Sequence, residues 1–278
     1  MKGKEFGGRM RSAALVLALW GCTAGEPEDT DPSGDSDTGE DSDTGEDTDV
    51  VGSAALSGVV SDESGDPVVG ASVNFCLLQC TTVETDETGA YTFPSLPVQS
   101  GSFYVKPPSE DPSVMACLTP LTLAADEVRE INVTMFVGES HALPDNAEEV
   151  EVAEGLYLSV GTDILEPAPF KQLGDVVRGV HVPDGMSLPI DVDAPEVIAV
   201  WYLGPFEATA EEGLPFRIEN LWELPESGQY QVWFASDPAE SAWHSAGTVT
   251  VDAQGEWLEG EGEIDIFTTV VLTTISAE

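Results

Sequence analysis

The sequence predicts an all-β protein in which two β-sandwich domains follow an export leader and an acidic linker. From residue 54 onward, short runs of β-branched or alternating apolar residues recur roughly every 8–15 residues. Gly, Pro, Asp and Asn separate these runs, as they separate strands in sandwiches. No long stretch of this region repeats its apolar residues with the period of about 3.6 that a helix requires. These three observations favour strands over helices throughout.

The first sandwich is expected over residues 54–137. Its last apolar run alternates, with Ile131, Val133 and Met135 on one face and polar residues on the other. Turn residues separate the other runs, and Gly89 can take the positive φ of a hairpin turn. The expected strands are residues 55–60, 71–76, 81–85, 90–93, 102–106 and 128–136.

Four short motifs in this region follow one another in a fixed order. They are LSGVV at 56–60, GDPVVGASV at 65–73, TDETGAYTF at 85–93 and Leu96-Pro97. In this order they resemble the carboxypeptidase-regulatory-like family of β-sandwiches, which is akin to transthyretin-like domains. The chain departs from that pattern by inserting residues 98–100 and a longer excursion at 107–119. The resemblance implies an accessory domain without catalysis.

The second sandwich is expected over residues 138–278. Its turns are marked by PDG at 183–185, PESG at 225–228 and DAQG at 252–255. The expected strands are residues 150–152, 156–160, 196–203, 216–220, 229–235, 247–251, 256–258 and 264–274.

The end of the second sandwich carries softer motifs. They are GLPFRI at 213–218, LPESG at 224–228, Trp243 before the Gly247 strand, and the turn at 252–255. Together they resemble the ZU5-like β domains of bacterial surface proteins.

The amino terminus has the pattern of an export signal. An apolar run at 15–20 is too short to span a bilayer, which takes about 20 residues. Leu19, Gly21 and Cys22 then resemble the lipobox of bacterial lipoproteins. That resemblance implies a signal peptide at 1–21 and acyl chains on Cys22. Thr23 in place of Asp implies sorting to the outer membrane.

The linker, residues 22–53, is strongly acidic. Residues 26–49 hold twelve acids and no base, and DSDTGE occurs at 35–40 and again at 41–46. A segment with so few apolar residues favours an extended, disordered spacer. The repeat also resembles a truncated calcium loop, although it lacks a ligand before the glycine and a glutamate six residues after it.

The formal net charge of −43 limits the partners. Such a chain repels nucleic acid and anionic lipid surfaces, so we expect no nucleic-acid partner. Membrane contact is expected through the lipid anchor, and a protein or polysaccharide partner at the cell surface.

Three cysteines lie beyond Cys22. Export places Cys76, Cys80 and Cys117 in an oxidising compartment. Cys76 and Cys80 flank three residues that can form a hairpin tip, which favours a bridge between them. A bridge from Cys117 to either one is the alternative. A zinc site lacks a fourth nearby ligand.

The sequence contains no recognisable catalytic motif. Its three histidines, His141, His181 and His244, have no metal-ligand spacing. There is no Gly-x-Ser-x-Gly elbow and no phosphate-binding loop. We therefore predict no catalytic residue, no metal and no cofactor, although the many carboxylates place acid pairs within reach by chance.

Aromatic residues of the second sandwich are the candidate ligand platform. Exposed aromatic rings beside carboxylates can stack on sugars, whereas buried rings fill a core. Tyr230 and Trp233 fall on opposite faces of one strand, so one of them is expected to point outward. The candidates are Trp201, Tyr230, Trp233 and Trp243.

The sequence therefore predicts a non-catalytic, lipid-anchored protein of the cell envelope that presents β-sandwiches for structural or recognition roles. A glycan-binding surface module is the first alternative, and an envelope enzyme of unspecified type is the second.

Overall fold

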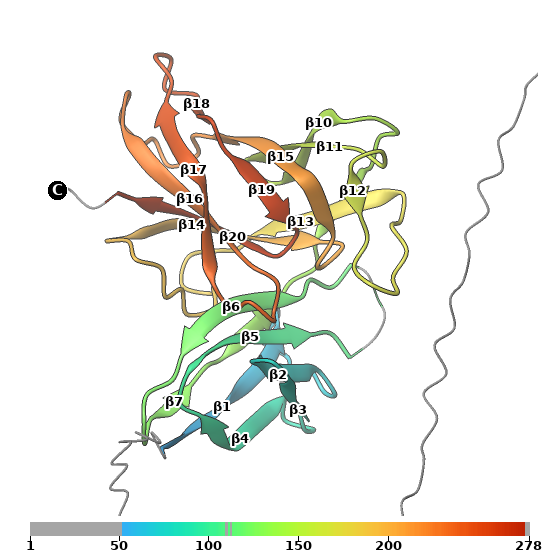
Figure 1. Ribbon diagram of the computed structural model, residues 1–278, viewed down its shortest axis with the longest axis vertical. Helices are drawn as coiled ribbons and strands as arrows, with labels where there is room; N and C mark the ends of the chain where they lie inside the picture. Colours follow the sequence, from blue (N-terminus) through green and yellow to red (C-terminus); the bar gives the residue numbers. More distant parts are fainter. Residues whose placement is uncertain (1–51, 109–110, 112, 276–278) are drawn as a thin grey trace, which may run out of the picture. The chain divides into compact units, whose positions relative to one another are not determined.

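The computed structural model describes residues 52–108, 111 and 113–275, and all its regular elements are β-strands (Figure 1). The predicted all-β class is confirmed. Cys22 and the acidic repeat lie outside the described residues. Within the described part, no helix has the length and apolarity to cross a bilayer.

The first eight strands form two four-stranded sheets. In one sheet β1 is central, with β4 antiparallel on one side and β7 and β8 parallel on the other. Alternate residues of β1, including Leu56 and Val60, are buried, as expected for a strand with one face in a core. The bounds are β1 (Ser53–Asp62), β4 (Ala90–Pro97), β7 (Val128–Glu130) and β8 (Val133–Met135).

The other four-stranded sheet is antiparallel, in the order β3-β2-β5-β6. Phe75 and Phe103 from this sheet meet Phe93 from the first sheet in one apolar core. The bounds are β2 (Ser72–Cys76), β3 (Cys80–Glu84), β5 (Ser100–Lys106) and β6 (Cys117–Thr122).

The remaining strands form one twelve-stranded sheet. Its order is β10-β11-β15-β18-β17-β16-β20-β14-β13-β9, with β12 and β19 also pairing β15. The bounds are β9 (Glu139–Ala142), β10 (Glu148–Ala153), β11 (Leu156–Val160), β12 (Leu165–Glu166), β13 (Val176–His181), β14 (Val197–Gly204), β15 (Thr209–Glu219), β16 (Gln229–Ala235), β17 (Trp243–Val251), β18 (Trp257–Glu259), β19 (Glu263–Ile266) and β20 (Thr269–Thr274).

This large sheet curls until its ends approach each other. The first strand in the order, β10, contacts β13 and β9 at the opposite end. The approach depends on Gly179 of β13, because a Cβ there would lie 2.3 Å from the carbonyl oxygen of Val152. The sheet thereby surrounds a second core, which contains Trp201, Phe216 and Phe267.

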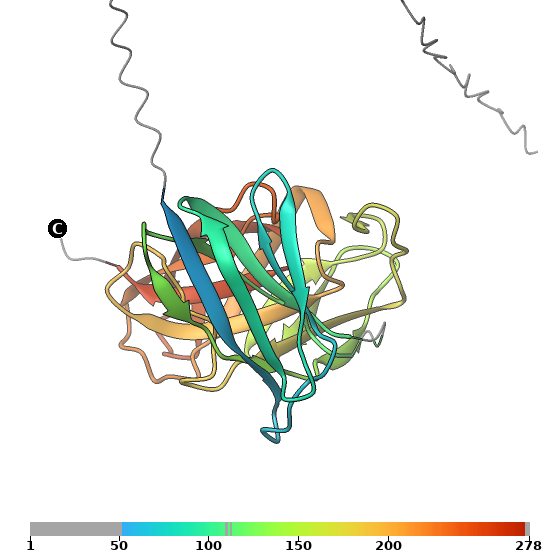
Figure 2. The same ribbon diagram turned by 90° about the horizontal axis from the view of Figure 1, so that it is seen from below.

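The two groups of strands share a buried junction. Val200, Tyr202 and Val271, on β14 and β20, belong to the same apolar cluster as Phe103. Thr269 Oγ1 donates a 2.5 Å hydrogen bond to the carbonyl of Leu118 on β6. All described strands therefore belong to one compact unit, and Figure 2 shows β1 to β6 stacked against the large sheet.

Some predicted strands differ from the structure. The run at 128–136 splits into β7 and β8, because Asn132 leaves the ladder and its side chain accepts from the Val59 amide. The run at 264–274 likewise splits into β19 and β20. β6, β9, β12 and β13 had not been predicted, and the proposed domain boundary at 137/138 stays a prediction.

Candidate functional site

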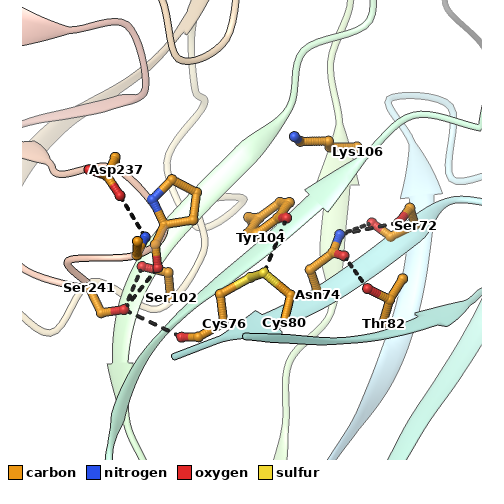
Figure 3. The surroundings of a disulfide bond; sticks show 12 residues. Ser72, Asn74, Cys76, Cys80, Thr82, Ser102, Tyr104, Lys106, Asp237 and Ser241 are labelled. Atoms are coloured by element: carbon orange, nitrogen blue, oxygen red, sulfur yellow. Dashed lines mark hydrogen bonds between the residues drawn. A yellow bond between two sulfur atoms is a disulfide. The ribbon is translucent and has the colours of Figure 1, made fainter. Parts of the chain in front are cut away.

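The cysteine prediction is confirmed. Cys76 and Cys80 face each other at the end of the β2–β3 hairpin and form a disulfide (Figure 3). Cys117 is free and fully buried at the start of β6. Burial raises the pKa of the Cys117 thiol well above its usual range. The thiol is therefore kept protonated and unreactive.

The predicted aromatic platform needs correction. Trp201 is 0% exposed and Tyr230 is 6% exposed, so neither ring is available to a sugar. The Trp201 indole donates a 3.0 Å bond to the Glu154 carbonyl inside the second core. Trp233 and Trp243 are partly buried against the junction core. Trp201 and Tyr230 fill the second core because the curled sheet turns their strand faces inward, whereas Trp233 and Trp243 keep part of their surface exposed and stay a prediction.

A groove with a volume of about 1320 Å³ lies at the junction of the two sandwiches. The sequence did not indicate it, because its walls are loops that meet only in the fold. On one side lie the β2–β3 turn, the end of β5 and the residues before β6. On the other lie the loops that follow β12, β14 and β16.

Positive charge is concentrated in this groove. Only five lysines and arginines occur from residue 52 onward. Lys106, Lys171 and Arg178 line the groove, together with four acids. The other two lie elsewhere and are paired: Arg129 is 2.6 Å from Glu127 and Arg217 is 2.7 Å from Glu149. The lining therefore brings three of the five cations together, although its four acids leave it with a formal charge of −1.

Lys106 is already occupied within the groove. Its Nζ lies 3.5 Å from a Glu207 carboxylate oxygen and about 5 Å from the ring centres of Tyr104 and Phe206. Burial raises the pKa of the Tyr104 hydroxyl, and the charge of Glu207 adds to this shift. These contacts fix Lys106 as part of the wall.

Lys171 and Arg178 differ from Lys106. Neither forms a salt bridge with any residue that the structure describes. The Nε of Arg178 is also buried without a hydrogen-bond acceptor in that part of the chain. Arg178 does act at longer range on Asp111: hydrogen bonds from Ser113 lower the pKa of that carboxyl, and the Arg178 charge lowers it further.

Two apolar side chains protrude at the groove. Leu78 is 99% exposed and Phe170 is 107% exposed, more than any other large hydrophobic residue described. Phe170 has a φ of 65°, in the left-handed region that a bulky residue rarely adopts. Glu207, also in the wall, has the same φ. Backbone strain of this kind clusters at functional sites.

The disulfide holds Leu78 in place. Leu78 lies in the three-residue tip closed by Cys76 and Cys80. This tip is tied to the loop after β16: the Ser241 hydroxyl lies 3.4 Å from the Cys76 carbonyl oxygen and accepts a bond from Ser102 at 3.1 Å (Figure 3). The position of Leu78 is thus fixed by both sandwiches.

Six prolines make the walls stiff and poor in donors. Proline fixes φ near −65° and has no backbone N–H. Walls of this composition cannot extend a sheet, and they recognise a ligand through side chains. The prolines are Pro107, Pro108, Pro167, Pro169, Pro205 and Pro238.

A smaller recess of about 490 Å³ has an acidic lining that includes Glu261, Glu263 and His244. In the described residues no group of His, Cys, Asp or Glu side chains is arranged to hold a metal ion. The lining of the large groove contains no histidine, and its two cysteines are joined in the disulfide. The chemistry available in the large groove is charge pairing and apolar contact.

Comparisons with known proteins are sparse. No protein-family model matches the chain, and no curated protein matches it. Among solved structures, the Bacillus anthracis TIE protein is similar, with 8% identity and a TM-score of 0.26 over 82% of this chain. The chain spans 49% of that protein's length.

The major pilin subunit BcpA of Bacillus cereus is also similar. It aligns with 11% identity and a TM-score of 0.24, over 80% of this chain and 95% of the pilin. Its D312A variant aligns with the same identity and TM-score, over 74% of this chain and 85% of the pilin. Likenesses this low indicate no shared function.

Proposed function

We propose that this protein is a non-catalytic, exported surface protein that is held to the membrane by lipid on Cys22 and recognises a partner through the junction groove. The observation that carries the proposal is the pairing of exposed Leu78 and Phe170 with Lys171 and Arg178 in one groove. Fully exposed large apolar side chains gain nothing in the isolated protein. Their burial by a partner is favourable by about 1.5–3 kcal/mol for each side chain.

The groove is also suited to binding because its shape is fixed in advance. The disulfide, the prolines and the Ser241 contacts hold both walls before any ligand arrives. A preformed site avoids the ordering cost that a flexible loop must meet on association. This arrangement supports recognition.

Anchoring is supported by the sequence alone. The lipobox-like residues Leu19, Gly21 and Cys22 follow an apolar run of export-signal length. The acidic linker and a net charge of −43 oppose any electrostatic binding to anionic lipid. Acyl chains on Cys22 supply the attachment in this proposal, and Thr23 supports the outer membrane as its location.

Fractionation of cells that express Cys22→Ser tests the anchor. The unaltered protein is expected in the membrane fraction, and the variant is expected in the soluble exported fraction. A variant that stays with the membrane would contradict lipid anchoring.

Capture from a surface-labelled envelope fraction tests recognition. The full-length Cys22→Ser protein serves as bait, beside the same bait with Phe170→Ser and Lys171→Gln. A labelled species retained by the first bait and lost from the second supports groove recognition. Equal retention by both baits contradicts it, and a chemically altered species released by either bait favours the enzyme alternative.

A further inference from the structure

We propose that the groove binds an extended segment of an acidic partner protein, with carboxylates at Lys171 and Arg178 and an apolar side chain against Leu78 and Phe170. This inference rests on the proposed recognition function, because it names the chemical class of the partner. It is carried by charge pairing, by apolar exposure and by the composition of the walls.

The charge pairing points to an anion. Lysines and arginines in this chain are scarce, and three of the five from residue 52 onward already have a carboxylate within 3.5 Å. Lys171 and Arg178 are the two that lack one in the described part, and both line the groove. A carboxylate from outside would pair with the charge of the Arg178 guanidinium, although its Nε is buried and not itself open to a ligand. Guanidinium–carboxylate pairs are among the stronger hydrogen-bonded contacts.

The apolar exposure points to a polypeptide. A polyanionic sugar chain offers carboxylates but few side chains that an aliphatic residue such as Leu78 can bury. A peptide offers carboxylates and apolar side chains at neighbouring positions. Its carboxylate can pair with Lys171 while its apolar side chain contacts the adjacent Phe170. The lining also includes the partly buried Leu77 and Val114, which add apolar surface.

The chain's own acidic linker offers the carboxylates that the groove requires but not the apolar side chains. Residues 26–49 carry twelve acids but almost no apolar side chain. A peptide of that sequence can satisfy Lys171 and Arg178 and leaves Leu78 and Phe170 in water. It therefore serves as the probe for charge alone.

Panning a random peptide-display library on the full-length Cys22→Ser protein tests the inference. We expect enriched peptides that place Asp or Glu next to Phe, Tyr, Trp, Leu or Met. Synthetic copies should bind at least about tenfold more weakly to Lys171→Gln and to Arg178→Gln. Binding should also weaken as salt rises from about 0.05 M to about 0.5 M, because added ions screen the pairing.

Matched controls lie elsewhere on the surface. Arg129→Gln removes the same charge from a cation that is already paired, and it should leave peptide binding unchanged. Val128→Ser removes an apolar side chain that is 80% exposed on β7, and it is the control for Phe170→Ser. A peptide of residues 26–49 should bind at least about tenfold more weakly than the selected peptides.

Several outcomes would overturn the inference. They are enrichment of no peptide, enrichment of basic peptides, or equal binding to the groove variants and the controls. If polygalacturonate binds saturably at the groove and no peptide is enriched, the groove is a site for an anionic polysaccharide. If the protein self-associates and Lys171→Gln abolishes this association, the groove binds a second copy of the chain. The envelope capture separates this inference from the proposed function. If the species captured through the groove resists protease, the groove still recognises a partner, but that partner is not a protein.

Discussion

Two of the places where basic and aromatic side chains lie close together on this protein differ in whether the basic group is paired. On the outer face of β11 and β15, Arg217 lies 3.9 Å from the Trp257 ring centre, beside Tyr157, and pairs with Glu149. At the groove, Phe170 and Lys171 are exposed, and neither has such a partner in the described residues.

The difference shows that an abundance of aromatic residues does not indicate a binding surface. Trp201 of the second sandwich is fully buried, and the partly buried Trp222 packs against it edge to face with 5.8 Å between ring centres. The groove owes its character to a few side chains that remain uncovered. Four predictions distinguish side chains that support the fold from side chains that are left uncovered at the groove. They are ordered by the decreasing size of the effect.

Trp201→Ala should lower the free energy of unfolding by about 3–5 kcal/mol, because it leaves a large cavity in the second core. Phe170→Ala should change it by no more than about 0.5 kcal/mol, because that ring is in water. Urea denaturation of both variants measures the contrast. Similar losses would mean that Phe170 supports the fold rather than a ligand.

Replacing both Cys76 and Cys80 by Ser should lower the free energy of unfolding by about 2 kcal/mol, the chain-entropy value for so short a loop. The same variant should bind the selected peptides less tightly, because Leu78 is no longer held at the groove. Denaturation and peptide titration give the two values. If this variant binds the peptides as tightly as the unaltered protein, Leu78 is not part of the proposed contact.

Stability should fall as pH rises above about 9, where an unfolded thiol begins to ionise, and more steeply above about 10, where an unfolded tyrosine does. Burial raises the pKa of the Tyr202 hydroxyl, and burial likewise raises the pKa of the Cys117 thiol. A group with a raised folded pKa contributes its stability below the unfolded pKa, and that contribution is lost as pH rises towards the folded value.

The loss should approach about 1.4 kcal/mol per pH unit for each group above its unfolded pKa. Denaturation midpoints between about pH 8 and pH 11 measure it. Tyr202→Phe should reduce the slope above pH 10. An unchanged slope would mean that the alkaline loss arises from other groups.

Phe170→Gly should raise the free energy of unfolding by about 1 kcal/mol, because glycine adopts a φ of 65° without strain. The same change should weaken binding of the selected peptides. Calorimetry and peptide titration read the two effects. A variant that is less stable would show that the Phe170 ring makes contacts worth more than the strain.

Local patterns in the sequence were sufficient for much of the fold. The alternation in β1 and the compact spacing of Cys76 and Cys80 both depend on neighbours in the chain, and both were predicted. β6 was missed because Pro120 interrupts its apolar run, yet β6 pairs only with β5 and tolerates a proline on its free edge. β9 was missed because its four residues, Glu139–Ala142, have no apolar alternation.

The groove was not predictable in this way. Residues that lie side by side in it, such as those near Leu78 and those near Phe170, are far apart in the chain and belong to loops without a period. Their exposure depends on how two sandwiches meet. Trp201 and Tyr230 were wrongly predicted as platform residues because strand alternation gives two faces but does not say which of them a curled sheet encloses.

The meeting of β10 with β9 and β13, which Gly179 permits, has a consequence for proteins packed at high density. Open sheet margins present rows of free amides and carbonyls that recruit strands from neighbouring molecules and seed aggregates. Here the outermost strands of the largest sheet cover one another. Crowded copies are therefore less able to add strands to the largest sheet, and the edge strands that remain, such as β3 and β4, belong to the two smaller sheets.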